Sequence, residues 1–195
     1  MRAPPLLLLF FANALACSST PRLLEPAQPS APRARAVALG PTASVDANWK
    51  ERLEQPYVFL EHVGDYRRLG ETMALLEAQA EARGLPPDGP PFALFYDDPG
   101  LVDIDRLRAR VCCPVVERPS GTDALQFDLL PRAMVVYARV EGAWTDVAEA
   151  YPALFAYLCE LGWSQGGPVR EVYLASPRGT GVVTEIQIPW AARAE

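Results

Sequence analysis

The chain has 195 residues, of which 50% are hydrophobic and 22% charged, as in an ordinary globular protein with one well-formed core. Its formal net charge is −6 and its lysines and arginines do not cluster, so the sequence carries no electrostatic footprint for nucleic acid or anionic lipid. These values predict one folded domain and argue against a nucleic-acid-binding protein.

The first sixteen residues have the layout of an export signal. One arginine precedes an apolar run that continues to Leu15, too short to span a bilayer, and small residues then lead to Cys17. The ending "ALAC" resembles a bacterial lipoprotein signal, in which the cysteine becomes the lipidated first residue. We expect 1–16 to be a signal peptide and Cys17 to carry a lipid anchor in the bacterial cell envelope. The alternative is a secreted or periplasmic protein.

The next segment, residues 18–48, is rich in proline, alanine and serine and shows no sustained hydrophobic period. Such a segment buries too little apolar surface to fold, so we expect a disordered tether. The folded domain is predicted to span residues 52–190.

The folded part contains an internal repeat, with one copy at about 56–116 and a second at about 132–190. Self-similarity of this kind indicates the duplication of one supersecondary unit. With a shift of 78 residues and no gap, Val58, Gly64, Leu76, Gly84, Gly89, Pro90 and Pro99 fall on Val136, Gly142, Leu154, Gly162, Gly167, Pro168 and Pro177.

Each copy predicts the order strand, helix, strand, strand. A β-rich run is followed by a glycine turn and by an apolar stripe at helical spacing, with Asp65 and Asp146 as candidate N-caps. Gly84 and Gly162 suit the left-handed position that ends a helix. The fold class is therefore α+β. We expect antiparallel sheets with helices on one side, pseudo-twofold symmetry, and a ligand groove between the two units.

The cysteines and the single histidine give no metal-binding spacing, and we expect no metal and no cofactor. In an oxidising compartment, Cys112 or Cys113 is able to pair with Cys159. The alternative is that these residues are buried free thiols. His62 is expected to be structural or exposed.

Several motifs resemble the GyrI-like small-molecule-binding domain, which is also the effector-binding module of AraC-type and MerR-type multidrug-responsive regulators. They are "G-x-Y" or "G-x-W" at the start of each helix, "YDDP" in the first copy, and "GP-x-x-E-x-Y" in the second. The resemblance covers residues 52–190 and implies a duplicated fold with a central groove. No helix-turn-helix region precedes it, so a transcriptional role is not expected.

Glu171 is the leading candidate for the site. On its predicted strand it shares a face with Val169 and Tyr173, and the repeat places Ala93 at the same position of the first copy. A carboxylate that the unit itself required would be present in both copies. The resemblance implies that Glu171 lies at the bottom of the groove, facing cationic aromatic ligands, with Tyr173 beside it. The alternative is a solvated acid, or one paired with an arginine.

Aromatic side chains near such an acid would attract a cation through their ring faces. The expected ligand-binding residues besides Glu171 and Tyr173 are Trp163, Tyr96, Trp144, Tyr66 and Tyr137. Tyr66 and Trp144 occupy matching positions in the two copies, which favours packing as much as ligand binding.

Three functions remain open. The first is an exported, lipid-anchored protein that binds an apolar or cationic aromatic compound, with Glu171 as the polar anchor. The second, implied by stand-alone relatives that hydrolyse cyclopropanoid compounds, is a cofactor-independent hydrolase of strained electrophiles with Glu171 as acid/base. The third is a scaffold whose groove takes a protein segment. The sequence favours the binding protein.

Overall fold

A computed structural model describes residues 35–39, 43–120, 125–175 and 182–192. Their ten strands form one sheet in the order β1-β2-β7-β10-β9-β4-β5-β3-β6, with β8 added beside β10, and each pairing is antiparallel. The elements are β1 (Arg35–Leu39), β2 (Ala43–Arg52), β3 (Gln55–Val63), η1 (Tyr66–Arg68), α1 (Leu69–Ala82), β4 (Phe92–Phe95), η2 (Ile104–Arg106), β5 (Arg108–Pro114), β6 (Gln126–Leu130), β7 (Ala133–Glu141), α2 (Trp144–Glu160), β8 (Trp163–Gln165), β9 (Val169–Ala175) and β10 (Val182–Ala192).

The predicted duplication is present in the structure. β3 and β7 are offset by 78 residues at both ends, and the first unit (β3, α1, β4, β5) matches the second (β7, α2, β9, β10). Gly84 (φ +63°) and Gly162 (φ +73°) follow the two helices in the left-handed region, as expected for residues that end a helix. The α+β class and the strand-helix-strand-strand order are confirmed.

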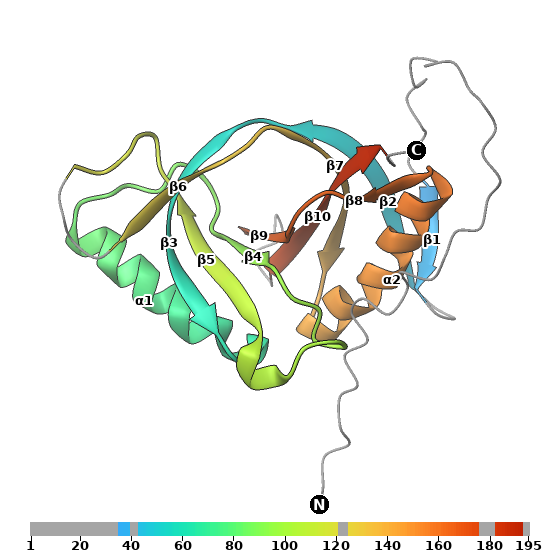
Figure 1. Cartoon of the computed structure of the whole chain (residues 1–195), viewed down its shortest axis with the longest axis horizontal. Coiled ribbons are helices and arrows are strands. Elements are labelled where there is room, and N and C mark those ends of the chain that lie inside the picture. The colour runs from blue at the N-terminus through green and yellow to red at the C-terminus, as the bar shows by residue number, and fades with distance from the viewer. Residues whose placement is uncertain (1–34, 40–42, 121–124, 176–181, 193–195) are drawn as a thin grey trace, which may run out of the picture.

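The two units meet at β4 and β9, which lie between the helices in Figure 1. Ala93 lies directly opposite Glu171 in this pairing. These two residues are also the ones that the repeat superposes. The pseudo-twofold axis therefore passes between Ala93 and Glu171, so the candidate acid lies where the two units join.

The units also exchange arms, which the sequence did not predict. β2 precedes β3 in the chain but pairs with β7, while β6 precedes β7 but pairs with β3. The continuous ribbons β2–β3 and β6–β7 run across the top of Figure 1. Each unit's arm thus completes the sheet of the other unit.

The predicted tether over 18–48 is wrong at its end, because residues 35–39 and 43–48 lie in β1 and β2. Val45, Ala47 and Trp49 alternate with polar residues there, a strand pattern hidden within a stretch rich in alanine and proline. Ala47 is fully buried, which fixes this strand to the core. The remaining tether residues, the signal peptide and Cys17 lie outside the described residues.

The sheet has two differently filled faces. Both helices cover the face that carries Ala93, Val169 and Glu171, which holds the main core. The other face holds a smaller cluster around Phe92 and Val172. Arg170 points to this second face, where its guanidinium lies 4.0 Å from the centroid of the Phe92 ring. The expected alternation along β9 is confirmed.

The second helix begins earlier than predicted. Asp146 is not its N-cap but its third residue, and its carboxylate accepts a 2.7 Å hydrogen bond from the Ala143 amide. Asp65 caps the 3-10 helix η1, by accepting a 3.0 Å hydrogen bond from the Arg67 amide, whereas the N-cap of α1 is Arg68. The earlier start brings Trp144 into the first turn of α2, next to the interface between the units.

Cys112 and Cys113 are buried free thiols, which excludes the bridge from either of them to Cys159. No described helix combines the length and apolar character that crossing a bilayer requires. Within the same residues, no cluster of three or more His, Cys, Asp or Glu side chains is arranged to hold a metal ion.

Candidate functional site

A groove of about 590 Å³ opens at the interface between the two units. It lies between η1 with α1 on one side and the start of α2 on the other, above β9. Its walls are largely apolar, as in most small-molecule sites. The lining residues are Tyr66, Arg67, Leu69, Gly70, Met73, Glu77, Pro91, Trp144, Tyr173 and Val182.

Two aromatic residues face this groove from equivalent positions of the repeat. Tyr66 begins η1 and Trp144 begins α2, and the shift of 78 superposes them. The Tyr66 ring packs edge-on against Phe95, and its hydroxyl lies 2.8 Å from the Arg108 carbonyl oxygen. Tyr66 is therefore fixed in place before any ligand arrives, while Trp144 is half-buried at the opposite wall.

Glu171 lies beneath the groove and is only 1% exposed. Two phenols donate hydrogen bonds to its carboxylate: Tyr151 of α2 to Oε1 at 2.5 Å, and Tyr173 to Oε2 at 3.2 Å. Tyr173 also lines the groove. The acid is thus separated from the groove by the phenol that it binds.

Burial raises the pKa of Glu171 to about 7, because a charged carboxylate loses its hydration there; the hydrogen bonds from Tyr151 and Tyr173 oppose that shift. Burial and the neighbouring carboxylate raise the pKa of both phenols, so they remain protonated donors. Near neutral pH the carboxyl group is poised between its two protonation states.

No ion pair within the described ranges includes Glu171, and its neighbour Arg170 points to the opposite face of the sheet. An ionised carboxylate in such a place lacks a counter-charge. It gains most from a cation that enters the groove, because Coulomb attraction is strong where water is excluded.

The hydrogen-bonded residues all belong to the second unit. At the positions that correspond to Tyr151, Glu171 and Tyr173, the first unit carries Met73, Ala93 and Phe95. The duplicated framework therefore needs none of the three polar groups for folding. Their joint presence on one side of the axis indicates a role outside the framework.

The sequence profile of the GyrI-like small molecule binding domain matches residues 48–191. The chain belongs to the GyrI-like family. Among curated proteins, none matches the chain by sequence.

Solved structures resemble this GyrI-like domain in fold. EcmrR in complex with DNA is 18% identical, with a TM-score of 0.67, and the match covers 76% of this chain and 58% of EcmrR. The isolated C-terminal domain of EcmrR is also 18% identical, with a TM-score of 0.64, and the match covers 76% of this chain and 99% of that domain. A hydrolase from Listeria innocua has 11% identity and a TM-score of 0.50, over 74% of this chain and 91% of that one. SAV2435 bound to tetraphenylphosphonium has 12% identity and a TM-score of 0.51, over 74% and 93%.

These comparisons establish the shared fold. This chain matches little more than half of the EcmrR chain in the DNA complex. The part of EcmrR that is matched almost in full is its C-terminal domain.

The groove of this GyrI-like domain brings together only some of the predicted residues. Tyr66, Trp144 and Tyr173 line it, and Glu171 lies directly below. The role of these four residues in binding a ligand stays a prediction.

The other three candidates lie elsewhere. Trp163 stacks on Trp190 with ring centroids 3.7 Å apart. Tyr96 is 40% exposed and lies 5.6 Å from the Arg110 guanidinium carbon on the second face of the sheet. Tyr137 lies under the Lys50 ammonium at 4.3 Å. None of the three lines the groove of the GyrI-like domain.

Tyr151 was not among the site residues predicted from the sequence. It is buried, but its hydroxyl reaches Glu171. A signal was present in the repeat, because Tyr151 replaces Met73 while Glu171 replaces Ala93. Two substitutions to polar residues at facing positions of one unit predict that they contact each other.

Proposed function

We propose that the protein binds apolar, cationic aromatic small molecules in the groove between its two units. The single observation that carries this proposal is the buried carboxylate of Glu171. It has no cationic partner among the described residues, and only the phenol of Tyr173 separates it from a groove with aromatic walls. The relative SAV2435, which is bound to tetraphenylphosphonium, supports a ligand of this class.

Binding and ionisation of Glu171 are coupled in this proposal. A cation in the groove stabilises the charged carboxylate, and by linkage the charged carboxylate strengthens binding of the cation. The aromatic faces of Tyr66, Trp144 and Tyr173 add cation–π attraction. A neutral compound of the same shape fills the same apolar walls but does not respond to the charge.

The test measures affinity for tetraphenylphosphonium by titration calorimetry from pH 5.5 to 8.5. Because the pKa of Glu171 is about 7, wild-type affinity is expected to rise by roughly tenfold or more across this range, whereas Glu171→Gln gives a flat profile. A neutral tetra-aryl compound serves as the control ligand. Equal affinity and equal pH dependence for wild type and Glu171→Gln would refute the site.

A second candidate is hydrolysis of a strained, cyclopropane-bearing electrophile. The pKa of Glu171 near 7 favours it, since a carboxyl group that is half-protonated at neutral pH suits general acid–base chemistry. Protonated Glu171 passes a proton through the hydroxyl of Tyr173, which lines the groove, to the leaving carbon as the ring bond breaks; water adds to the other carbon and returns a proton to the carboxylate by the same path. The similar fold of a hydrolase from Listeria innocua supports this alternative.

Turnover of such a compound separates the two functions. General-acid catalysis predicts a rate that falls as pH rises above about 7 and that is lost in Glu171→Gln. No turnover above the buffer rate, with binding retained, leaves binding as the function.

We further propose that the protein is exported and anchored in the cell envelope by a lipid on Cys17, following the signal-like sequence of residues 1–16. Mass spectrometry of the membrane-extracted protein is expected to show a mature N-terminus at Cys17 with a diacylglyceryl mass. Cys17→Ala is expected to release the protein from the membrane. An unmodified Cys17, or a different N-terminus, would contradict the anchor.

A further inference from the structure

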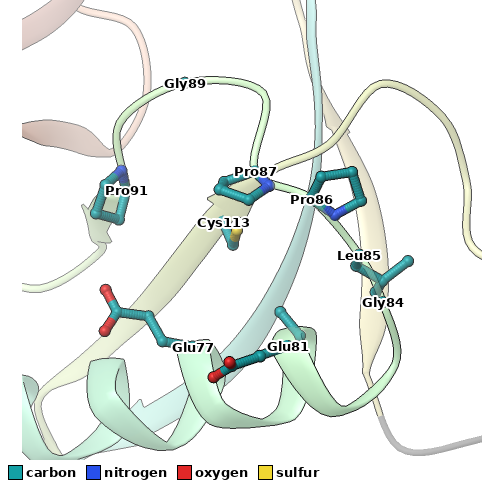
Figure 2. A pocket seen from close by; sticks show the side chains of 10 residues that line it. Glu77, Glu81, Gly84, Leu85, Pro86, Pro87, Gly89, Pro91 and Cys113 are labelled. Atoms are coloured by element: carbon teal, nitrogen blue, oxygen red, sulfur yellow. The ribbon is translucent and has the colours of Figure 1, made fainter.

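A second cavity, of about 630 Å³, lies beside the central groove along α1 (Figure 2). Glu77 and Pro91 line both cavities, so the two spaces adjoin at these residues. α1 forms one wall, residues 84–91 form the other, and Cys113 of β5 lies at the back.

The wall formed by residues 84–91 is built to leave this space open. In the second unit the corresponding segment is β8, which pairs with β10. Pro86 and Pro87 have no amide hydrogen, so this part of the first unit is poorly suited to add an equivalent strand. The Asp88 amide donates to the Pro114 carbonyl at 2.9 Å, and the Tyr173 amide to the Pro91 carbonyl at 3.0 Å. The segment is therefore held at its middle and at its far end, while the Leu85 amide attaches its start to α1 by donating to the Ala80 carbonyl at 3.0 Å.

The second unit carries larger side chains at the corresponding positions. Phe155 stands at the position of Glu77, and Trp163 at that of Leu85. Trp163 stacks on Trp190 with an interplanar angle of 4°. The fold thus accepts large aromatic residues here, and the first unit has a glutamate, a leucine and two prolines at the corresponding positions instead.

The open cavity also carries charge. Glu77 and Glu81, one helical turn apart, both line it, and Figure 2 shows their carboxylates beside the cavity. Within the described ranges no ion pair includes either residue. The nearby Arg83 donates instead to the Gln79 carbonyl at 2.8 Å. Two like charges at this spacing disfavour the helix slightly, so a positively charged occupant complements the wall.

We propose that this second cavity is a subsite for part of the ligand. The aromatic part of the ligand occupies the central groove, and an aliphatic chain that ends in a positive charge extends from it into the second cavity. The inference rests on the small-molecule-binding function proposed above. The preferred ligands are then elongated cationic compounds with one charge near Glu171 and a second near Glu77 and Glu81. The apolar chain between them passes Pro91 and contacts Leu85 and Ala80.

The test compares three quinolinium compounds by titration calorimetry at pH 8: the N-methyl compound, the N-decyl compound, and a bis-quinolinium joined by a decane-1,10-diyl chain. A fully buried methylene improves affinity by roughly fourfold, so the decyl compound is expected to bind at least a hundredfold more tightly than the methyl compound. The second charge is expected to add about another two- to fivefold, as for an ion pair with exposed carboxylates.

Two variants assign these gains to the second cavity. Leu85→Trp places in the first unit the residue that the second unit has, and is expected to remove the gain of the decyl chain while methyl-quinolinium affinity stays within twofold. Glu77→Gln/Glu81→Gln is expected to remove only the advantage of the bis-quinolinium over the decyl compound. Both side chains of this second variant are exposed, so its folding is not at risk.

Matched controls lie outside both cavities. Ala78→Trp adds the same ring to an exposed residue of α1, and Glu54→Gln/Glu117→Gln removes the same net charge from exposed positions. Each control is expected to bind the three compounds as wild type does.

The outcomes separate the two proposals. If methyl-quinolinium binds but chain length has no effect, or if the chain gain survives Leu85→Trp, the second subsite is wrong and the central groove stands. If the acid variant keeps the full bis-quinolinium advantage, the charged end lies elsewhere and the subsite as proposed is wrong. If none of the compounds binds, both proposals fail.

Discussion

At the scale of single residues, Glu171 combines features that oppose folding. It is buried to 1% exposure, its hydrogen bonds come from two neutral phenols, and no described ion pair compensates its charge. A buried charge of this kind costs several kcal/mol unless the group binds a proton or a counter-ion. The equivalent position of the first unit carries the methyl group of Ala93, so the fold itself does not require a buried carboxylate there.

The stability of the protein is expected to report this cost as a function of pH. The folded pKa of Glu171, about 7, lies above its ordinary value of 4.5. Below pH 4.5 both states are protonated; between pH 4.5 and 7 the unfolded state releases its proton and the folded state retains it, so stability falls as pH rises. The total loss is on the order of 3 kcal/mol, reached above pH 7.

Urea unfolding at pH 5 and pH 8 measures this effect. The free energy of unfolding of Glu171→Gln minus that of wild type is expected to be larger at pH 8 than at pH 5. Wild type loses stability over this range as Glu171 titrates, and the variant cannot titrate at this position. Glu71→Gln is the control without a pH effect: its hydrogen bond to Arg68 lowers the pKa of Glu71 below 4.5, so this group is ionised in both states from pH 5 to pH 8. A difference between Glu171→Gln and wild type that does not change with pH would contradict the pKa assignment.

At the scale of secondary-structure elements, the repeat made most of the fold predictable. Both helices, the glycines that end them and the faces of β9 follow from local periodicity and the shift of 78. Tyr96 was predicted to bind the ligand, but it lies on the other face of the sheet. The sequence already indicated this, because Tyr96 is three residues beyond Ala93 and side chains alternate between the faces of a strand. Tyr137 differs, because the side on which β7 presents it depends on a register with β10 that no local pattern reveals.

The segments after the two helices show the limit of the repeat as a guide. Residues 84–91 and β8 occupy corresponding places, yet one lines a cavity and the other extends the sheet. The cause of this difference can be recognised in the sequence, because Pro86 and Pro87 have no amide hydrogen to donate to a neighbouring strand. What the sequence does not reveal is the volume that remains behind them, because volume depends on how α1 and β5 pack.

At the scale of the whole molecule, the exchanged arms join the two units at places other than β4 and β9. Asn48 pairs with Tyr137, and Gln55 pairs with Leu130, so each unit holds a strand of the other. The groove therefore lies between units that are joined at both ends of the sheet as well as at its centre. Such contacts join residues far apart in sequence, so periodicity within a segment cannot reveal them.

The arm β2 is expected to contribute to the stability of the entire domain. Trp49 packs on the main core and lies edge-on to Trp163, with ring centroids 6.4 Å apart. Trp49→Ala is expected to lower the free energy of unfolding by about 2 kcal/mol, less than for a fully buried tryptophan because Trp49 is only partly buried. Urea unfolding followed by circular dichroism and by tryptophan fluorescence should give coincident transitions, since both units unfold together.

Leu53→Ala is the matched control, because Leu53 lies just beyond β2 and is 65% exposed. It is expected to change the free energy of unfolding by less than about 0.5 kcal/mol. If Trp49→Ala behaved like Leu53→Ala, the arm would not be docked in solution, and the folded domain would begin after residue 48, as its composition alone had indicated. A loss confined to Trp49→Ala instead makes β2 a structural part of the second unit, which contributes Trp144 and Tyr173 to the groove.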